Sequence, residues 1–393
     1  MARRERTGLH QSVTLADRTY HLALRSGLEI VTDTAPAAAL VAENTVLRDG
    51  ERVLVAPCGD GLLGMWATDR AGSAGVSCFD TNALAVETTQ RNLQAAGLAD
   101  VPVRTAVPEV EAVPYDTFVM PLPKGRDLAR LWLLNGALAT RMGGQIVIAG
   151  ANRAGIQSVA RDAEALLGPG RLLGYRKGNR ALSFQRQELA VEELDAFRAP
   201  GLRNGTFARY TFCHGGHALT VCTRPGVFSR DALDEGTQML LQELDVHPDD
   251  RVLDVGCGAG VIGLVAALYA DPASVTLSDI DSLATECARE TLRQNGINGP
   301  SVLLGDGLSA VEGQRFTLIV TNPPFHQGHT VNTGMTEGWI RQAYRALLPG
   351  GRLVLVANRF LPYASWLQTG FDRVSILAED SRFQVFSAQR TQR

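Results

Sequence analysis

Short β-branched apolar runs alternate along this chain with longer segments that have a helical period. The clearest series lies in the C-terminal half. In order, its strand-like and helix-like segments are 252–253, 275–277, 282–295, 316–320, 338–348 and 352–356. Alternating strands and helices are typical of a parallel sheet covered by helices. We therefore predict an α/β fold with a doubly wound, mostly parallel sheet.

The chain also repeats itself at a constant offset, so that residue 52 aligns with residue 251. The segment 52–64, RVLVAPCGDGLLG, matches the segment 251–263, RVLDVGCGAGVIG. Two tandem copies of one domain explain this match economically. A stretch rich in Pro, Gly and Asn near residue 200 separates the copies, so we expect domains at 1–200 and 201–393.

The C-terminal copy carries a glycine-rich turn and acidic residues after successive predicted strands. The candidate cofactor-binding residues are Asp254, Gly256, Gly258, Gly260, Asp279 and Asp306. The glycines let the backbone approach a ligand, and Asp279 ends the second strand, where a carboxylate can bind ribose hydroxyls. Asp306 follows the third strand and can accept a hydrogen bond from an adenine amine. Three carboxylates would repel a pyrophosphate but suit S-adenosylmethionine, which carries positive charge.

The tetrad Asn322-Pro323-Pro324-Phe325 follows the predicted fourth strand. It resembles the [Asp/Asn/Ser]-Pro-Pro-[Tyr/Phe] motif of class I S-adenosylmethionine-dependent methyltransferases that act on planar nitrogens. With the segments 225–236 and 356–363, it makes the chain resemble the RsmC/RlmG family of ribosomal RNA guanine-N2 methyltransferases. The resemblance implies two tandem Rossmann-like domains, the N-terminal one degenerate. It also implies S-adenosylmethionine as cofactor and a guanine of ribosomal RNA, preferably of the small subunit, as substrate.

The tetrad also has a physical logic of its own. A base amine delocalises its lone pair and is a poor nucleophile. The Asn322 side-chain oxygen and the Pro323 carbonyl would accept its two N–H bonds and align the lone pair with the methyl group. Proline stiffens this backbone, and Phe325 would stack on the base. We therefore expect Asn322, Pro323, Pro324 and Phe325 to be catalytic.

Two residues near the tetrad are expected to contact the substrate. His326 directly follows the tetrad, and Phe228 lies in a segment that covers the cofactor and substrate cleft in the family that the chain resembles. In the same segment, Ser229 or Asp231 is expected to cap a helix over 232–243.

Other acceptors and another class of protein stay open at this point. The acceptor could be adenine N6 in DNA or RNA, or a protein glutamine amide. Phenylalanine at position 325 and the duplication favour guanine over the glutamine enzymes. A non-catalytic RNA-binding or assembly factor is the alternative from a different class, and the intact tetrad speaks against it.

The N-terminal copy has lost several of the matching residues, although Asp80 and two glycines of the turn survive. Val55 stands at the position of Asp254, Pro57 at that of Gly256, and 121–124 (PLPK) at that of the tetrad. A proline in the turn blocks close approach of a ligand, and the lost carboxylate removes a partner for a cation. We therefore expect the N-terminal copy to be degenerate and without catalytic activity.

Charge gives this degenerate copy a different role. The whole chain has a net charge of −3, but residues 121–230 hold 16 basic and 7 acidic residues. Most of this excess lies in the N-terminal copy, after the strands that would border the lost cofactor site. We therefore predict that this copy positions RNA. The residues predicted to bind the RNA backbone are Lys124, Arg126 and Arg153.

Composition bears on whether the protein spans a membrane, is secreted or binds a metal. No apolar run approaches the roughly 18–20 residues of a membrane span, and polar residues stand where a signal peptide would have its apolar core. The six cysteines form no Cys-x-x-Cys pair, and the group Cys213, His214, His217 and Cys222 has no common zinc spacing. We expect a cytoplasmic enzyme without a metal, and a monomer, because two linked copies can substitute for a dimer.

Overall fold

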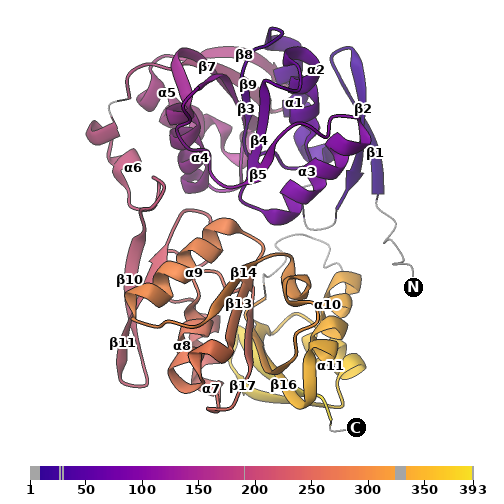
Figure 1. Ribbon diagram of the computed structural model, residues 1–393, viewed down its shortest axis with the longest axis vertical. Coiled ribbons are helices and arrows are strands. Elements are labelled where there is room, and N and C mark those ends of the chain that lie inside the picture. Colours follow the sequence, from indigo (N-terminus) through magenta and orange to yellow (C-terminus); the bar gives the residue numbers. More distant parts are fainter. Residues whose placement is uncertain (1–8, 26–27, 29–30, 190, 324–332, 392–393) are drawn as a thin grey trace. The chain divides into compact units, whose positions relative to one another are not determined.

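The computed structural model describes the chain except for residues 1–8, 26–27, 29–30, 190, 324–332 and 392–393 (Figure 1). The chain divides into two compact units, Met1–Thr206 and Phe207–Arg393. This division lies a few residues after the boundary that the sequence predicts.

The N-terminal unit begins with a β-hairpin and then alternates strands with helices. Its hairpin and strands are β1 (Leu9–Leu15), β2 (Arg18–Leu24), β3 (Val53–Val55), β4 (Val76–Asp80), β5 (Val103–Thr105), β6 (Tyr115–Pro121), β7 (Thr140–Ala151), β8 (Arg171–Arg176) and β9 (Asn179–Gln185). Its α-helices are α1 (Val31–Asn44), α2 (Leu62–Ala71), α3 (Ala83–Ala95), α4 (Arg126–Ala139), α5 (Ile156–Leu167) and α6 (Asp195–Arg198).

The C-terminal unit has the same plan, again after a hairpin. Its strands are β10 (Ala208–His214), β11 (His217–Thr223), β12 (Val252–Val255), β13 (Val275–Asp279), β14 (Ser301–Leu304), β15 (Phe316–Thr321), β16 (Leu347–Asn358), β17 (Arg373–Glu379) and β18 (Phe383–Gln389). Its α-helices are α7 (Glu235–Glu243), α8 (Val261–Tyr269), α9 (Ser282–Gln294), α10 (Thr333–Ala346) and α11 (Tyr363–Gly370).

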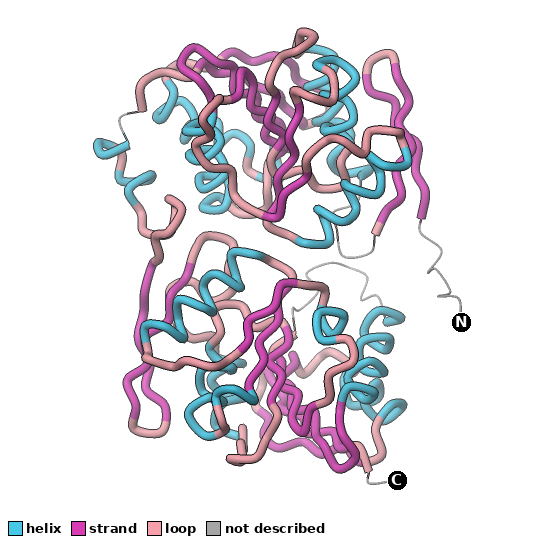
Figure 2. Tube along the Cα trace, in the orientation of Figure 1, coloured by secondary structure: helices cyan, strands magenta, loops and turns pink. Residues whose placement is uncertain are grey.

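The two units contain seven-stranded sheets of the same topology. The strand order is β5-β4-β3-β6-β7-β9-β8 in the first and β14-β13-β12-β15-β16-β18-β17 in the second. In each sheet the first five strands are parallel, and β9 or β18 runs antiparallel to both neighbours. Helices flank both sheets in Figure 2. The predicted pair of tandem, mostly parallel α/β domains is therefore confirmed.

Within the C-terminal unit, the order of the strands indicates where on the sheet a ligand would bind. β12 pairs with β13 on one side and with β15 on the other, so the strand order reverses at β12. The carboxyl ends of parallel strands meet at one edge of a sheet, and ligands bind where the order reverses. The glycine turn after β12 and Asn322 after β15 therefore lie at the same edge.

Close packing of α8 holds the glycine turn in place. The α8 sequence VIGLVAALY is apolar almost throughout, and most of it is buried. At Gly263 a Cβ atom would lie 2.4 Å from the Leu277 side chain of β13. The helix can approach the sheet this closely only because a glycine stands there. Gly64, at the same position of the N-terminal unit, has the same constraint against Cys78.

Candidate active site

The turn between β12 and α8 opens on one side and is tightly packed on the other. Gly256, Gly258 and Gly260 all have positive φ, at 69°, 53° and 81°. A Cβ atom on Gly256 or Gly258 would meet no atom of the described residues within 4 Å, whereas one on Gly260 would lie 2.9 Å from the Cβ of Ala288 in α9. Gly256 and Gly258 therefore leave room for a ligand, and Gly260 lets the turn pack against α9.

Asp254 lies beneath this turn, at the carboxyl end of β12. Its side chain is fully buried, and its Oδ2 accepts a hydrogen bond of 2.8 Å from the Gly263 amide of α8. Its Oδ1 has no hydrogen-bond partner among the described residues. Burial raises the pKa of Asp254 to about 7, and the negative charge of Asp279 adds to this effect. The carboxylate thus fastens β12 to α8; its direct contact with a cofactor stays a prediction.

Asp279 at the end of β13 is fastened to the same turn. Its Oδ2 accepts a hydrogen bond of 2.8 Å from the Gly258 amide, and its Oδ1 one of 3.0 Å from the Asp281 amide. Burial raises the pKa of Asp279, and the backbone hydrogen bonds oppose this effect. Because a carboxylate has about four acceptor positions, both oxygens retain capacity for ribose hydroxyls.

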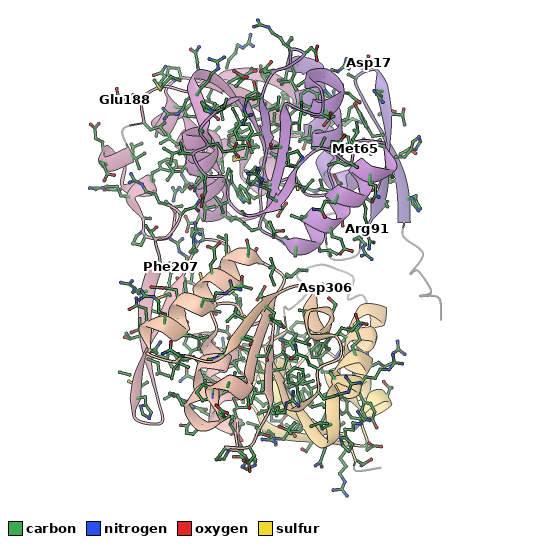
Figure 3. All side chains as sticks on the ribbon, in the orientation of Figure 1. Asp17, Met65, Arg91, Glu188, Phe207 and Asp306 are labelled. Atoms are coloured by element: carbon green, nitrogen blue, oxygen red, sulfur yellow. The ribbon has the colours of Figure 1, made fainter. Side chains whose placement is uncertain are left out.

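Asp306 follows β14, and its side chain is exposed (Figure 3). The amide of Gly305 donates a hydrogen bond of 2.8 Å to the Asp279 carbonyl, which ties this loop to the end of β13. The structure therefore places the three predicted carboxylates at or just beyond the carboxyl ends of three adjacent strands of one sheet. The donor set fits S-adenosylmethionine: an open glycine cradle, an exposed acceptor, and a buried carboxylate with one oxygen that no described residue partners.

Asn322 follows β15, and its amide is held at one end only. Its Nδ2 donates hydrogen bonds to Thr237 Oγ1, at 2.8 Å, and to Asp234 Oδ2, at 3.1 Å. Its Oδ1 is buried and has no hydrogen-bond partner among the described residues. A buried polar atom without a partner is costly, so this oxygen is expected to receive a donor from a ligand.

The structure covers only part of the tetrad. Pro323 is described and half-buried. Pro324, Phe325 and His326 lie outside the described residues, so their roles stay predictions.

The segment before α7 differs from its prediction. The helix begins at Glu235, and Asp234 caps it by accepting a hydrogen bond of 2.9 Å from the Thr237 amide. The expected cap at Ser229 or Asp231 is therefore wrong. Asp and Ser both favour the N-cap position, so residue type alone does not distinguish Asp234 from Ser229 and Asp231 a few residues earlier.

Two aromatic side chains are exposed in the segments beside this edge. Phe228, between β11 and α7, is 55% exposed, and Phe360, two residues after the end of β16, is 80% exposed. The segment of Phe228 is anchored by Arg224, which is fully buried and forms an ion pair of 2.6 Å with Glu286 of α9. The exposure of Phe228 leaves its ring accessible, and its contact with the substrate stays a prediction.

The N-terminal unit keeps one part of this site. Asp80 accepts hydrogen bonds of 3.0 Å from the amides of Gly59 and Asn82, the same pair of contacts that Asp279 makes. Burial raises the pKa of Asp80 to about 6. Val55 is a buried strand residue at the position of Asp254, so this unit has no second carboxylate there.

The predicted RNA-binding residues follow β6 and β7 in this unit, and all three are exposed. Arg126 is not an isolated cation, because its Nε and Nη2 form hydrogen bonds of 2.8 and 2.7 Å with Asp162 of α5. Arg130 shares that buried carboxylate at 3.0 Å. Lys124 and Arg153 lie at the same edge of the sheet, after β6 and β7. Contact of these residues with RNA stays a prediction.

Within the described parts of the chain, no helix is long and apolar enough to cross a bilayer. The same residues contain no group of three or more His, Cys, Asp or Glu side chains arranged to hold a metal ion.

Known proteins are similar to this chain in sequence and in fold. The family model "Methyltransferase small domain" matches residues 218–387, and "Methyltransferase small domain N-terminal" matches residues 72–171. "Ribosomal RNA small subunit methyltransferase C" of Escherichia coli (strain SMS-3-5 / SECEC) is 38% identical over 279 residues, which cover 70% of this chain and 76% of the relative. The protein of the same name from Serratia proteamaculans (strain 568) is 35% identical over 281 residues, 70% of this chain and 74% of the relative.

A solved structure extends the similarity to almost the whole chain. It is the T. thermophilus 16S rRNA N2 G1207 methyltransferase (RsmC) in complex with AdoMet and guanosine, with a TM-score of 0.78 and 28% identity. The match covers 97% of this chain and 98% of that chain. Together with the geometry above, these matches define an S-adenosylmethionine-dependent methyltransferase with two tandem α/β domains. The chain belongs to the ribosomal RNA small subunit methyltransferase C family. The predicted family, enzyme class and cofactor are therefore confirmed.

Proposed function

We propose that this chain transfers a methyl group from S-adenosylmethionine to the exocyclic N2 amine of a guanine in small-subunit ribosomal RNA, with Asn322 and Pro323 as the acceptors that bind the amine. The observation that carries the mechanism is the asymmetry of the Asn322 amide. Its nitrogen is fully engaged by Asp234 and Thr237, whereas its oxygen is buried without a partner among the described residues.

The reaction requires the amine to be held rather than deprotonated beforehand. The N2 lone pair is delocalised into the guanine ring, so the amine is neutral and nearly planar. Asn322 Oδ1 accepts one N–H and the Pro323 carbonyl the other, which favours a pyramidal nitrogen with its lone pair toward the methyl group. When bound, S-adenosylmethionine supplies that methyl group in electrophilic form on a sulfonium. The methylated nitrogen is then cationic and acidic, and its proton leaves to water.

The carboxylates of the C-terminal unit would hold the cofactor. Asp279 binds the ribose hydroxyls, because it already fixes the Gly258 amide at the open side of the turn. Asp306, which is exposed after β14, accepts from the adenine amine. Asp254 places negative charge beneath the turn and balances the positive charge of the cofactor. Gly256 and Gly258 leave the space that the cofactor fills.

The substrate assignment draws on the relatives and on the charge of the N-terminal unit. The T. thermophilus relative is named for N2 methylation of 16S rRNA and was solved with guanosine. In our proposal Lys124, Arg126 and Arg153 bind the RNA backbone, while Phe228, Phe325 and His326 contact the target base or its neighbours. A ribosomal substrate places the enzyme in the cytoplasm, and we infer that it acts as a monomer.

Methyl-labelled cofactor tests the substrate. The enzyme is incubated with isolated small subunits, large subunits and protein-free ribosomal RNA, and incorporation is followed over time. The proposal expects label in the RNA of the small-subunit or naked-RNA samples, and labelling slower by about 100-fold or more with Asn322→Ala. Label in protein, in adenine, or only in large-subunit RNA would overturn it.

A further inference from the structure

We propose that Asp234 and Thr237 are positioning residues that fix the orientation of the Asn322 amide, so that its oxygen and not its nitrogen faces the substrate amine. This inference rests on the proposed role of Asn322 as an acceptor. It assigns a function to the start of α7, which lies in the segment before the catalytic sheet and contributes no atom to the reaction itself.

Both hydrogens of the Asn322 Nδ2 are occupied. Thr237 Oγ1 accepts at 2.8 Å and Asp234 Oδ2 at 3.1 Å, and the two acceptors are themselves linked by a contact of 3.4 Å. The Thr237 hydroxyl donates to the carboxylate and uses its lone pair for the amide. Each polar atom of this small network is therefore assigned as either the donor or the acceptor of each of its hydrogen bonds.

The network makes the two orientations of the amide unequal. A 180° rotation of the Asn322 side-chain amide would bring its oxygen against Asp234 Oδ2. An ionised carboxylate accepts hydrogen bonds and donates none, so that contact would set two acceptors against each other. The rotated amide would also present an N–H group to the substrate amine, where an acceptor is needed. Asp234 therefore selects the catalytically competent orientation.

The fold holds Asp234 rigidly in place. As the N-cap of α7, its Oδ2 also accepts a hydrogen bond of 2.9 Å from the Thr237 amide, and its carbonyl accepts one of 2.8 Å from the Gln238 amide. Gly236 leaves space for the carboxylate, because a Cβ there would lie 3.1 Å from Oδ2. Capping and amide orientation therefore use the same carboxylate oxygen, which couples the start of α7 to the end of β15.

Thr237→Val is the cleanest perturbation, because it removes the hydroxyl but keeps the shape and leaves the cap of α7 intact. We expect kcat to fall about 10- to 100-fold, the scale of a misplaced reacting group. The KM for RNA and the affinity for S-adenosylmethionine should change little. Thr237→Ser should restore most of kcat. The matched control is Thr317→Val, which removes a threonine hydroxyl that bonds Asp250 at 2.6 Å at the other end of β15.

A double-mutant cycle distinguishes a positioning role from a structural one. If Thr237 acts through Asn322, Thr237→Val should have no further effect on the slow single-turnover rate of Asn322→Ala. Independent, multiplicative losses would overturn the inference, as would a loss in Thr317→Val equal to that in Thr237→Val. If Asn322→Ala itself retained full activity, the proposed function of Asn322 would fail first, which separates the two outcomes.

Discussion

Substitution of Gly258 and of Gly260, in the turn between β12 and α8, is expected to have different effects. Gly258→Ala should mainly weaken cofactor binding, and Gly260→Ala should mainly lower stability. Gly258 has φ +53°, and a Cβ there would meet none of the residues that the structure describes within 4 Å. A left-handed backbone costs an L-residue about 1–2 kcal/mol, and the lower entropy of the unfolded chain offsets about 0.4–1 kcal/mol of that cost. Gly258→Ala should therefore lower the free energy of unfolding by only about 1 kcal/mol. Because the new methyl group would enter the predicted cofactor cradle, affinity for S-adenosylmethionine should fall by about tenfold or more.

Gly260→Ala carries the same backbone cost and adds a steric collision. Its Cβ would lie 2.9 Å from the Ala288 Cβ and 3.0 Å from the Ala288 Cα. Overpacking of this kind costs about 1–3 kcal/mol, so the total loss of unfolding free energy should reach about 2–4 kcal/mol. Urea denaturation of the full chain measures stability, and isothermal titration calorimetry measures cofactor affinity. Equal losses of stability in the two variants, or normal cofactor binding by Gly258→Ala, would refute this account of the turn.

Further predictions concern charge. Burial raises the pKa of Asp254 to about 7 from 3.8. The protonated side chain therefore contributes fully to the free energy of unfolding below about pH 4, and this contribution is lost as the pH rises through 7. Urea denaturation across this range should show a smaller loss for Asp254→Asn; an unchanged profile would contradict the assignment. In filter binding, Lys124→Glu should weaken RNA binding and reduce the salt slope by about 1, with cofactor affinity unchanged. Arg126→Ala should weaken RNA binding less and cost only about 0.5–1 kcal/mol of stability, because Asp162 loses one arginine but keeps Arg130. Equal salt slopes for Lys124→Glu and the wild type would remove Lys124 from the RNA contact.

The fold, and the sheet edge at which the candidate cofactor-binding residues meet, could be predicted because their signals are local in sequence. The repeat of 52–64 at 251–263 implies two domains with the same strand order. A glycine-rich turn between an apolar strand and a helix has few structural solutions, and the carboxyl ends of parallel strands must share an edge. The confirmed family follows from motifs in the C-terminal copy.

The contacts that orient the site could not be predicted, because they join residues distant in sequence. Asn322 bonds residues 85 and 88 positions away, and only the packing of α7 against the sheet decides that these side chains meet. The ion pair between Arg126 and Asp162 joins residues 36 positions apart. The sequence alone does not show that the charge of Arg126 is partly neutralised by this carboxylate. The positions of Asp254 and Gly263 in the sequence do not say which backbone amide the carboxylate accepts from. The hydrogen bond from the Gly263 amide to Asp254 is therefore known only from the structure.

The central claim is that Asn322 presents its oxygen to the N2 amine of a guanine. Its most direct test is mass-spectrometric nucleoside analysis of small-subunit ribosomal RNA after a single turnover with a cofactor that carries a deuterated methyl group. The account predicts deuterated N2-methylguanosine with the wild type and with Thr317→Val, and a loss of about 100-fold or more with Asn322→Ala. Deuterium on another base or another guanine atom, or undiminished N2 labelling by Asn322→Ala, would contradict it.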